Sequence, residues 1–435
     1  MKERIDNLLK QMTLDEKISM LAGADAWHTV AIPRLGIPAI KVTDGPNGAR
    51  GSESRGGPTA ASFPVGVAMA ATWNPDVVRR IGEALAGEVR SKGAHILLAP
   101  TVNIHRSPLA GRNFECYSED PYLAARMAVA YITGLQSEGV GACIKHFVCN
   151  DSEFERKSMS SDVDMRALHE IYLTPFRIAL REARPWAVMS AYNKVNGTWA
   201  SENTFLLRDI LKGEWGFDGI VISDWFGTYT PRAASEGLDL EMPGPARWMG
   251  EEHVRAALES GALSSEELDD GVRRILSTIA RAGAFEHPAL QPERSVNLPQ
   301  DQALIREAAG EAIVLLKNRD NVLPLDLARD AAPSGVHSIA VIGELAAVPS
   351  FQGGGSSHVP PHYVVSPLDA IRAHADDRIT VDYAPGYTIR RTLPLIDAGW
   401  LAADDGTPGA LTTRFYDGLT PQGEPVDTGQ LDGPM

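Results

Sequence analysis

The sequence predicts an α/β protein built on a (β/α) barrel of the TIM type. Short apolar runs alternate with amphipathic helical stretches from residue 40 to about 285, a pattern typical of a parallel sheet covered by helices on both faces. Polar residues stand at or just beyond the end of these runs. The carboxyl ends of barrel strands face one mouth, so these residues would converge. A doubly wound sheet would gather ligands only near its switch point, so contributions from five strands favour the barrel.

Five apolar runs bounded by Gly, Pro or Asn are the expected strands. They are residues 39–43, 95–100, 142–148, 186–192 and 219–224. Helices are expected over 75–93 and 165–183. Thr13 with Glu16, and Ser264 with Glu267, each have the spacing of a capping box at a helix start, and Gly283 suits the end of the second helix.

The alternation of apolar runs and amphipathic helical stretches ends near residue 285. We expect a barrel over 1–285, a linker and connecting helix over 286–320, a partial α/β sandwich domain over 321–392, and the start of a β-rich insert over 393–435. The linker holds three prolines within 287–300, and a helix is expected at 301–318. In the second domain we expect strands at 338–343 and 379–383, with a helix at 367–375.

Composition narrows the class of partner. The 435 residues include 41 basic and 56 acidic ones, and the net charge of −15 disfavours nucleic acid and anionic membranes. No apolar run approaches the roughly 18 residues of a membrane span, and the N-terminus lacks the apolar core of a signal peptide, so we expect a cytoplasmic location. Cys116, Cys143 and Cys149 form no C-x-x-C pair and are expected to be reduced, buried thiols.

Several polar residues at strand ends have both a functional and a structural interpretation. Asp224 closes the run GIVISD beside Trp225, so it is either catalytic or a helix cap, and Trp225 either stacks on a sugar or packs in the core. Lys145–His146 would meet a ligand or an acid, or else form a surface ion pair and a core histidine. Asp44 could be a turn former and Arg112 a surface salt bridge.

The chain has no motif for a metal or a nucleotide. The segment FQGGGSSHVPPH (351–362) is rich in glycine but contains neither G-x-G-x-x-G nor G-K-[ST]. Eleven histidines include no H-E-x-x-H and no Cys/His cluster at ligand spacing. We therefore expect no cofactor and no metal, and a nucleotide-dependent enzyme is the weakest of the alternatives.

Six segments in order resemble glycoside hydrolase family 3, in its β-glucosidase branch, from the N-terminus to about residue 390. They are TDGPNGAR, GRNFECYSEDP, IKHFVCNDSEFER, MSAYNKVNG, VISDWFG and EGLDLEMPG. The resemblance implies a TIM-type (β/α)8 barrel with Asp224 as the nucleophile and the glycine loop at the active-site rim. It also implies a set of sugar ligands and a set of lining residues. The ligands would be Asp44, Arg112, Lys145, His146 and Arg156, and the lining Met189, Tyr192 and Trp225.

The expected activity is that of a retaining exo-acting β-glucosidase on a β-glucoside or oligosaccharide. We expect neighbouring cations to keep Asp224 ionised and Tyr192 to hydrogen-bond it. The family pattern implies a C-terminal truncation: the acid/base Glu would lie beyond residue 435, and 393–435 would open a β-sandwich insert like that of protective antigen. A β-xylosidase, another exo-glycosidase, or a sugar-binding fragment without turnover remain alternatives. The N-acetylglucosamine branch is set aside because 149–156 lacks its Asp–His pair. The sequence leaves homo-oligomer formation open.

Overall fold

The computed structural model describes residues 1–53, 56–325, 336–388, 393, 395–418 and 420–432. These residues form two compact units. The first comprises Met1–Leu323 with Ser350–Val364, and the second Pro324–Pro349 with Val365–Met435. The glycine loop therefore belongs to the same unit as the expected barrel.

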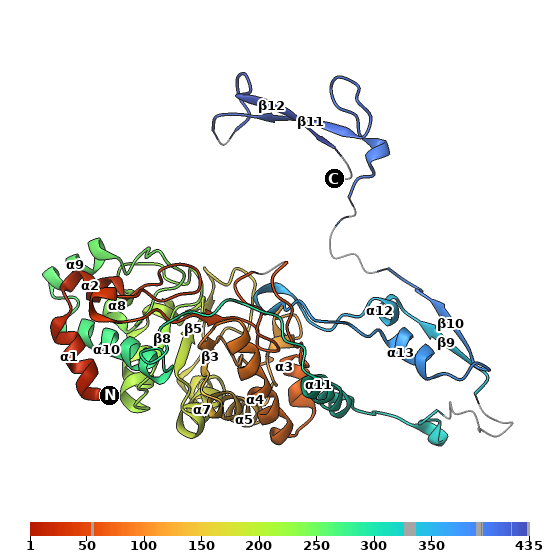
Figure 1. Ribbon diagram of the computed structural model, residues 1–435, viewed down its shortest axis with the longest axis horizontal. Coiled ribbons are helices and arrows are strands. Elements are labelled where there is room, and N and C mark those ends of the chain that lie inside the picture. Colours follow the sequence, from red (N-terminus) through yellow and green to blue (C-terminus); the bar gives the residue numbers. More distant parts are fainter. Residues whose placement is uncertain (54–55, 326–335, 389–392, 394, 419, 433–435) are drawn as a thin grey trace. The chain divides into compact units, whose positions relative to one another are not determined.

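A curled sheet of five parallel strands is the centre of the first unit (Figure 1). In spatial order the strands are β1 (Val42–Thr43), β2 (Ile96–Leu97), β3 (Gly141–Phe147), β5 (Ala187–Ser190) and β8 (Ile220–Ile222). Each overlaps one predicted run, and every strand residue is buried. The strands are short because only their central residues pair, while the polar residues that follow leave the sheet.

Isolated bridges continue this half-barrel into a ring. Ile222 pairs with Leu240 and Ala22 with Glu241, both in parallel, and antiparallel bridges at Gly23–Thr29 and His28–Lys41 return to the start of β1. The predicted barrel is confirmed. The closing segments at 21–29 and 239–241 were not predicted as strands, because single bridges impose no period-2 pattern on the sequence.

Helices cover the sheet, and α5 (Pro121–Ser137) packs against both α4 (Pro75–Ser91) and α7 (Thr174–Ala183). The first contact is close: a Cβ at Gly82 would lie 2.4 Å from the Tyr131 carbonyl oxygen, and one at Gly134 would lie 2.0 Å from the Arg79 carbonyl oxygen. Glycine is therefore required at both crossings. Helix α4 begins where predicted, with Asn74 capping two backbone amides.

Both predicted capping boxes are present. Thr13 and Glu16 start α2 (Leu14–Ser19), and Ser264 and Glu267 start α10 (Ser265–Arg281). Helix α1 (Lys2–Gln11) packs against α10, so the N-terminus is held on the barrel. All three cysteines are free and buried, as predicted.

Two predicted helices differ from the structure. Residues 165–183 divide into α6 (Met165–Ala167), a π-helical turn η3 (Leu168–Tyr172), and α7. Pro175 has no amide hydrogen, so carbonyls of the preceding turn lose their partners, and the Thr174 hydroxyl donates to those of His169 and Glu170 at 2.9 Å. Helix α11 (Pro299–Ala312) ends six residues before the expected Asn318. The Ile313–Val314 pair that follows is β-branched, which lowers helix propensity slightly.

The remaining elements of the first unit are short. They are η1 (Pro33–Leu35), α3 (Gly66–Ala71), η2 (Asn113–Glu115), β4 (Ser160–Ser161), β6 (Lys194–Val195), β7 (Thr198–Trp199), η4 (Ala200–Glu202), η5 (Phe205–Glu214), α8 (Ala233–Glu236), α9 (Glu251–Ser260), η6 (Arg319–Asn321) and η7 (Gly355–Ser357).

Two loops of the first unit are anchored by buried charges. Lys92 donates to the carbonyls of Arg294 at 2.9 Å and Thr59 at 3.2 Å, which fixes the linker against the barrel. The buried Glu241 carboxylate accepts from the amides of Arg247, Trp248 and Met249 at 2.9–3.0 Å. The backbone of the segment 245–249 is therefore anchored by a buried carboxylate, and the Met249 side chain is also buried in the core.

The second unit contains a parallel pair, β9 (Ser338–Ile342) with β10 (Thr380–Ala384), and helices α12 (Glu344–Ala347) and α13 (Pro367–His374). Ser366 caps α13. The expected strands and helix of this region are thus confirmed. The 3-10 turn η8 (Ala398–Trp400) is followed by a hairpin of β11 (Ala410–Phe415) and β12 (Asp427–Asp432). In the part of the chain that the structure describes, no helix has the length and apolar character of a bilayer span.

Candidate active site

A cavity of about 470 Å³ opens at the carboxyl ends of the barrel strands. Six of the nine predicted site residues line it, together with the glycine loop. The lining comprises Ala26, Trp27, Asp44, Arg50, Gly111, Arg112, Phe114, Glu115, Glu153, Arg156, Tyr192, Asp224, Trp225 and Gly353–Ser356. The predicted convergence of distant strand ends is therefore observed, and the glycine loop lies at this site as expected.

Asp224 stands two residues beyond β8 and is buried. Its Oδ1 accepts from the Trp225 amide at 2.7 Å, whereas its Oδ2 is buried and has no hydrogen-bond partner among the described residues. Burial raises the pKa of Asp224, and the opposing effects of Arg112 and Lys145 do not outweigh it. Desolvation is thus the larger effect on the pKa of this carboxyl, and the expectation that neighbouring cations keep Asp224 ionised stays a prediction.

His146 presents a lone pair to that unpaired oxygen. Asn103 Oδ1 lies 3.1 Å from His146 Nδ1 and also accepts the His146 amide at 3.0 Å, so Nδ1 is the protonated nitrogen. Burial, followed by Arg112 and Lys145, holds the pKa of His146 well below its usual range. Its Nε2 therefore carries no hydrogen. This nitrogen lies 3.5 Å from Asp224 Oδ2, and the contact is not an ion pair because the ring is neutral.

Asp44 and Lys145 form a buried ion pair. Lys145 lies near the end of β3, and Asp44 directly follows β1. Lys145 Nζ donates to Asp44 Oδ1 at 2.8 Å. Burial raises the pKa of Asp44, but Lys145 and Arg50 outweigh it, so the net shift is downward. The turn interpretation also holds: the Gly45 amide donates to the same oxygen at 2.8 Å, and a Cβ at Gly45 would lie 1.7 Å from the Gly48 carbonyl oxygen.

Two glutamates that the sequence did not single out hold two of the three arginines that line the cavity. Glu115 accepts two hydrogen bonds from Arg112, at 2.9 and 3.0 Å, and both side chains are largely buried. Glu153 accepts from Arg156 at 2.6 Å and lies 3.8 Å from Arg112. Arg112 is thus in a buried salt bridge, not the surface one considered as an alternative. Glu115 falls three residues after Arg112 within GRNFE, which is the signal that could have identified it.

Aromatic rings form one wall of the cavity. The Tyr192 hydroxyl donates to the Trp225 carbonyl at 2.9 Å and also interacts with Asp224, which, after burial, raises the tyrosine pKa. Trp225 donates through Nε1 to the Ala26 carbonyl at 3.0 Å, and its ring lies 5.4 Å from that of Trp27. Trp27 and Arg50 are further lining residues that the sequence reasoning missed.

The other predicted residues lie behind the lining or in the core. Lys145 and His146 each contact a carboxylate that lines the cavity. Met189 is buried in β5 opposite Ile222 and belongs to the apolar core, so the structure does not place it in the lining. Arg156 lies on the aromatic wall, 4.3 Å over the Tyr192 ring.

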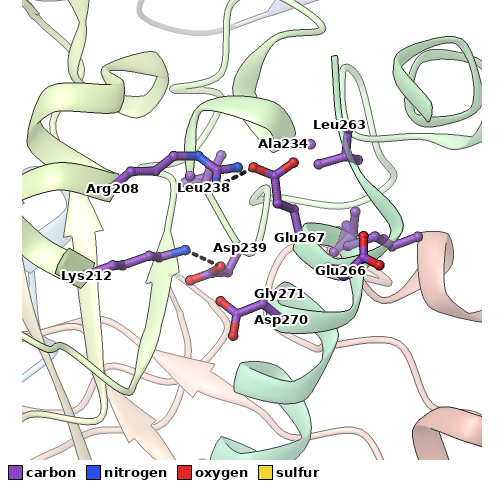
Figure 2. Close-up of a pocket in the computed structure, with 13 residues that line it drawn as sticks. Arg208, Lys212, Ala234, Leu238, Asp239, Leu263, Glu266, Glu267, Asp270 and Gly271 are labelled. Carbon is purple, nitrogen blue, oxygen red and sulfur yellow. Dashed lines mark hydrogen bonds and ion pairs between the residues drawn. The ribbon is translucent and has the colours of Figure 1, made fainter. Parts of the chain in front are cut away.

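A second cavity, of about 250 Å³, also holds charged side chains (Figure 2). Arg208 pairs with Glu267 at 2.8 Å, and Lys212 pairs with Asp239 at 2.6 Å. Asp239 accepts the Val221 amide at 2.8 Å through its other oxygen. No polar atom lining this cavity is among the buried, unpaired atoms of the described residues. These two ion pairs and the Val221 amide therefore connect η5, β8 and α10.

Comparison with known families identifies both halves of the chain. Residues 10–278 match the profile of the glycosyl hydrolase family 3 N terminal domain, and residues 313–425 match that of the family 3 C-terminal domain. The chain is 52% identical over 424 residues to a beta-glucosidase from Rhizobium radiobacter, covering 97% of this chain and 50% of that protein. It is 48% identical to beta-glucosidase B from Emericella nidulans, covering 97% and 49%.

Solved structures of beta-glucosidases are also similar to this chain. A beta-glucosidase from Kluyveromyces marxianus in complex with glucose superposes with a TM-score of 0.84 at 39% identity, covering 99% of this chain and 52% of that one. Beta-glucosidase 3B from Thermotoga neapolitana in complex with alpha-D-glucose gives a TM-score of 0.78 at 37% identity, covering 87% and 55%. The chain spans about half the length of these relatives.

Proposed function

The chain belongs to glycosyl hydrolase family 3, and we propose that it takes part in hydrolysis of terminal β-D-glucosyl residues by a retaining, exo-acting mechanism. One observation carries the proposal: a buried aspartate oxygen without a hydrogen-bond partner, at the strand-end cavity and beside neutral His146. The names of the relatives support glucose as the sugar.

In the proposed first step an Asp224 oxygen attacks the anomeric carbon while the bond from that carbon to the aglycone oxygen breaks. The bonding pair leaves with the aglycone oxygen, and the glucosyl group stays on Asp224 as an ester. Water then attacks the same carbon, and the bond from that carbon to Asp224 breaks with its electron pair returning to the carboxylate. Glucose is released, and the proton lost by the water balances the anion left on the aglycone oxygen, directly or through solvent. The raised pKa of the buried carboxyl fits a nucleophile that water does not stabilise. We assign no acid/base residue in this chain.

The proposed recognition of the sugar relies on paired donors and acceptors, because a glucoside has hydroxyls and no charge. Asp44 is held ionised by Lys145 and can accept from neighbouring hydroxyls. His146 Nε2 can accept another, and Arg156 can donate. A site that bonds each hydroxyl discriminates against sugars that lack one, since its own buried groups would stay unpaired.

Trapping the intermediate tests this proposal. The glucoside of 2,4-dinitrophenol has a leaving group that needs no protonation, so we expect it to place a hexosyl group on Asp224, located by mass spectrometry of the peptides. Azide, which needs no base, should release the sugar as β-glucosyl azide. The matched xyloside separates a xylosidase from a glucosidase by the ratio of rates.

The alternative of sugar binding without turnover has its own outcome. This alternative is favoured if glucose or an uncleaved 1-thio-β-D-glucoside binds the chain while the dinitrophenyl glucoside forms no adduct on Asp224. An adduct on another carboxylate would instead exclude Asp224 as the nucleophile. Asp224→Asn is the control and should carry no adduct.

A further inference from the structure

The edge of the strand-end cavity carries an exposed aromatic ring beside Trp225. Phe226 has an exposed fraction of 49% and a φ of 61°, a conformation uncommon for a bulky residue. Its amide donates to the Met242 carbonyl at 2.9 Å, which helps to hold this conformation. A phenyl ring held in solvent by a strained backbone, directly after a lining residue, indicates a role in binding rather than in packing.

Two cations lie against this ring. Lys157 Nζ is 5.8 Å from the centre of the Phe226 ring and 5.3 Å from that of Tyr192, a lining residue. The Arg247 guanidinium carbon is 5.9 Å from the centre of Phe226 from another segment. Both cations are exposed, and neither has an ion-pair partner among the described residues. Arg156, in contrast, is paired with Glu153.

The nearby carboxylate and backbone groups leave the charges of Lys157 and Arg247 free to meet a ligand. Glu202, the carboxylate beside Tyr229, already accepts from the amides of Tyr229 and Thr230 at 2.8 and 2.7 Å and from the Thr230 hydroxyl at 2.8 Å. The backbone at Lys157 accepts from Trp199 Nε1 at 3.1 Å, and that at Arg247 is bound by Glu241. Two unpaired cations on anchored segments are notable in a chain of net charge −15.

We propose that this rim, formed by Phe226, Lys157 and Arg247, selects aglycones that combine an aromatic ring with an anionic group, as in the β-glucosides of phenolic carboxylic acids. The ring would stack on Phe226, and the carboxylate would lie within reach of both cations. The inference rests on the proposed function, since it assumes that a glucosyl group occupies the cavity. It adds the class of aglycone, which the neutral sugar contacts do not determine.

Binding of two uncleaved ligands to the whole chain tests the proposal. In 4-carboxyphenyl and 4-carbamoylphenyl 1-thio-β-D-glucoside the aglycones match in shape and differ by one charge. By titration calorimetry at low ionic strength we expect the acid to bind about fivefold more tightly than the amide. The preference should shrink in 0.5 M salt, roughly where the Debye length falls to a few ångströms.

The variants assign the effect. Lys157→Met with Arg247→Met should abolish the preference for the acid and leave the affinity for the amide within about twofold. Lys2→Met with Lys10→Met removes the same charge from α1 and should leave the preference intact. Phe226→Ala should weaken both aryl ligands about fivefold, but not methyl 1-thio-β-D-glucoside.

Each result is decisive. Equal affinity for acid and amide in the unmodified chain would overturn the aglycone inference and leave the proposed function standing. A preference that survives the loss of both Lys157 and Arg247 would overturn this assignment of residues. If the chain binds none of the three thioglucosides, the proposed glucosyl site itself is wrong, and the inference is wrong with it.

Discussion

Two cavities of the first unit each place a buried aspartate beside β8, yet they differ in the partners of the aspartate oxygens. Asp239 has Lys212 at 2.6 Å and the Val221 amide at 2.8 Å, one partner for each oxygen (Figure 2). Asp224 has an amide for one oxygen, whereas the other has no hydrogen-bond partner among the described residues and lies 3.5 Å from His146 Nε2. Burial and nearby cations are common to both. We expect this unpaired oxygen to distinguish a reactive carboxylate from a structural one.

The largest expected effect separates these two aspartates by activity. Asp224→Asn should lower kcat/KM for 2,4-dinitrophenyl β-glucoside by at least about a thousandfold, because an amide does not attack the anomeric carbon. Asp239→Asn should retain kcat/KM within about threefold per folded molecule. Steady-state kinetics on protein of verified fold makes the measurement. Comparable losses in both variants would remove the distinction between the cavities.

In stability we expect the larger loss from Asp239→Asn and not from Asp224→Asn. Asp239→Asn leaves Lys212 without its buried partner, so we expect about 3 kcal/mol of lost unfolding free energy. Denaturant unfolding followed by circular dichroism measures the change. An unchanged midpoint would show that the second cavity is not held together by its charges.

The arginine network gives a smaller effect. Glu115→Gln keeps the shape of the side chain and weakens both charge-assisted bonds to Arg112, so we expect kcat/KM to fall about tenfold. If Glu115 positions Arg112 for the transition state, kcat should fall more than KM rises, and Glu115→Asp should restore only part of the loss. A change confined to thermal stability would limit Glu115 to packing.

The pH dependence of stability follows from the raised pKa of Asp224. The unfolded chain ionises this carboxyl at its ordinary value of about 3.9, whereas the buried carboxyl ionises at higher pH. Ionisation therefore destabilises the fold as pH rises from the ordinary value through the raised one. Asp224→Asn should melt at a higher temperature than the unmodified chain at pH 7, and the gain should vanish as pH falls to about 4. A lower melting temperature at pH 7 would reverse the assigned direction.

The smallest expected effect concerns Arg208 at the second cavity. Its ion pair with Glu267 is about one-third exposed, so solvent screens it, and Arg208→Ala should cost about 0.5 kcal/mol of unfolding free energy or less. Thermal melts at 50 mM and 500 mM salt should differ little between the variant and the parent. A loss of several kcal/mol would mean that the pair acts as a buried one.

The sequence predicted the positions of Asp44, Lys145 and Asp224 because Asp44 and Asp224 follow buried apolar runs and Lys145 stands near the end of one. Parallel strands bring such ends together. It did not predict the partners that decide their behaviour. Glu153 meets Arg112 only through folding. Whether the pKa of Asp224 is raised or lowered depends on the balance between desolvation by burial and attraction to nearby cations. No local sequence pattern reports that balance. Met189 was expected at the site because of its motif, whereas the structure buries it in the apolar core together with Ala187 and Val188 of β5.

The anchoring of segment 245–249 by Glu241 has a consequence for how such chains diversify. Three backbone amides hold the segment, so its conformation does not depend on which side chain stands at 247. Exchange of that side chain should change the charge presented at the rim without disturbing Asp224 or the folding of the barrel. On the proposed role of the rim, closely related chains would acquire different preferences for the leaving group while the chemistry proposed at Asp224 stays the same. The same independence makes position 247 a suitable place to begin when redesigning the preference of this chain.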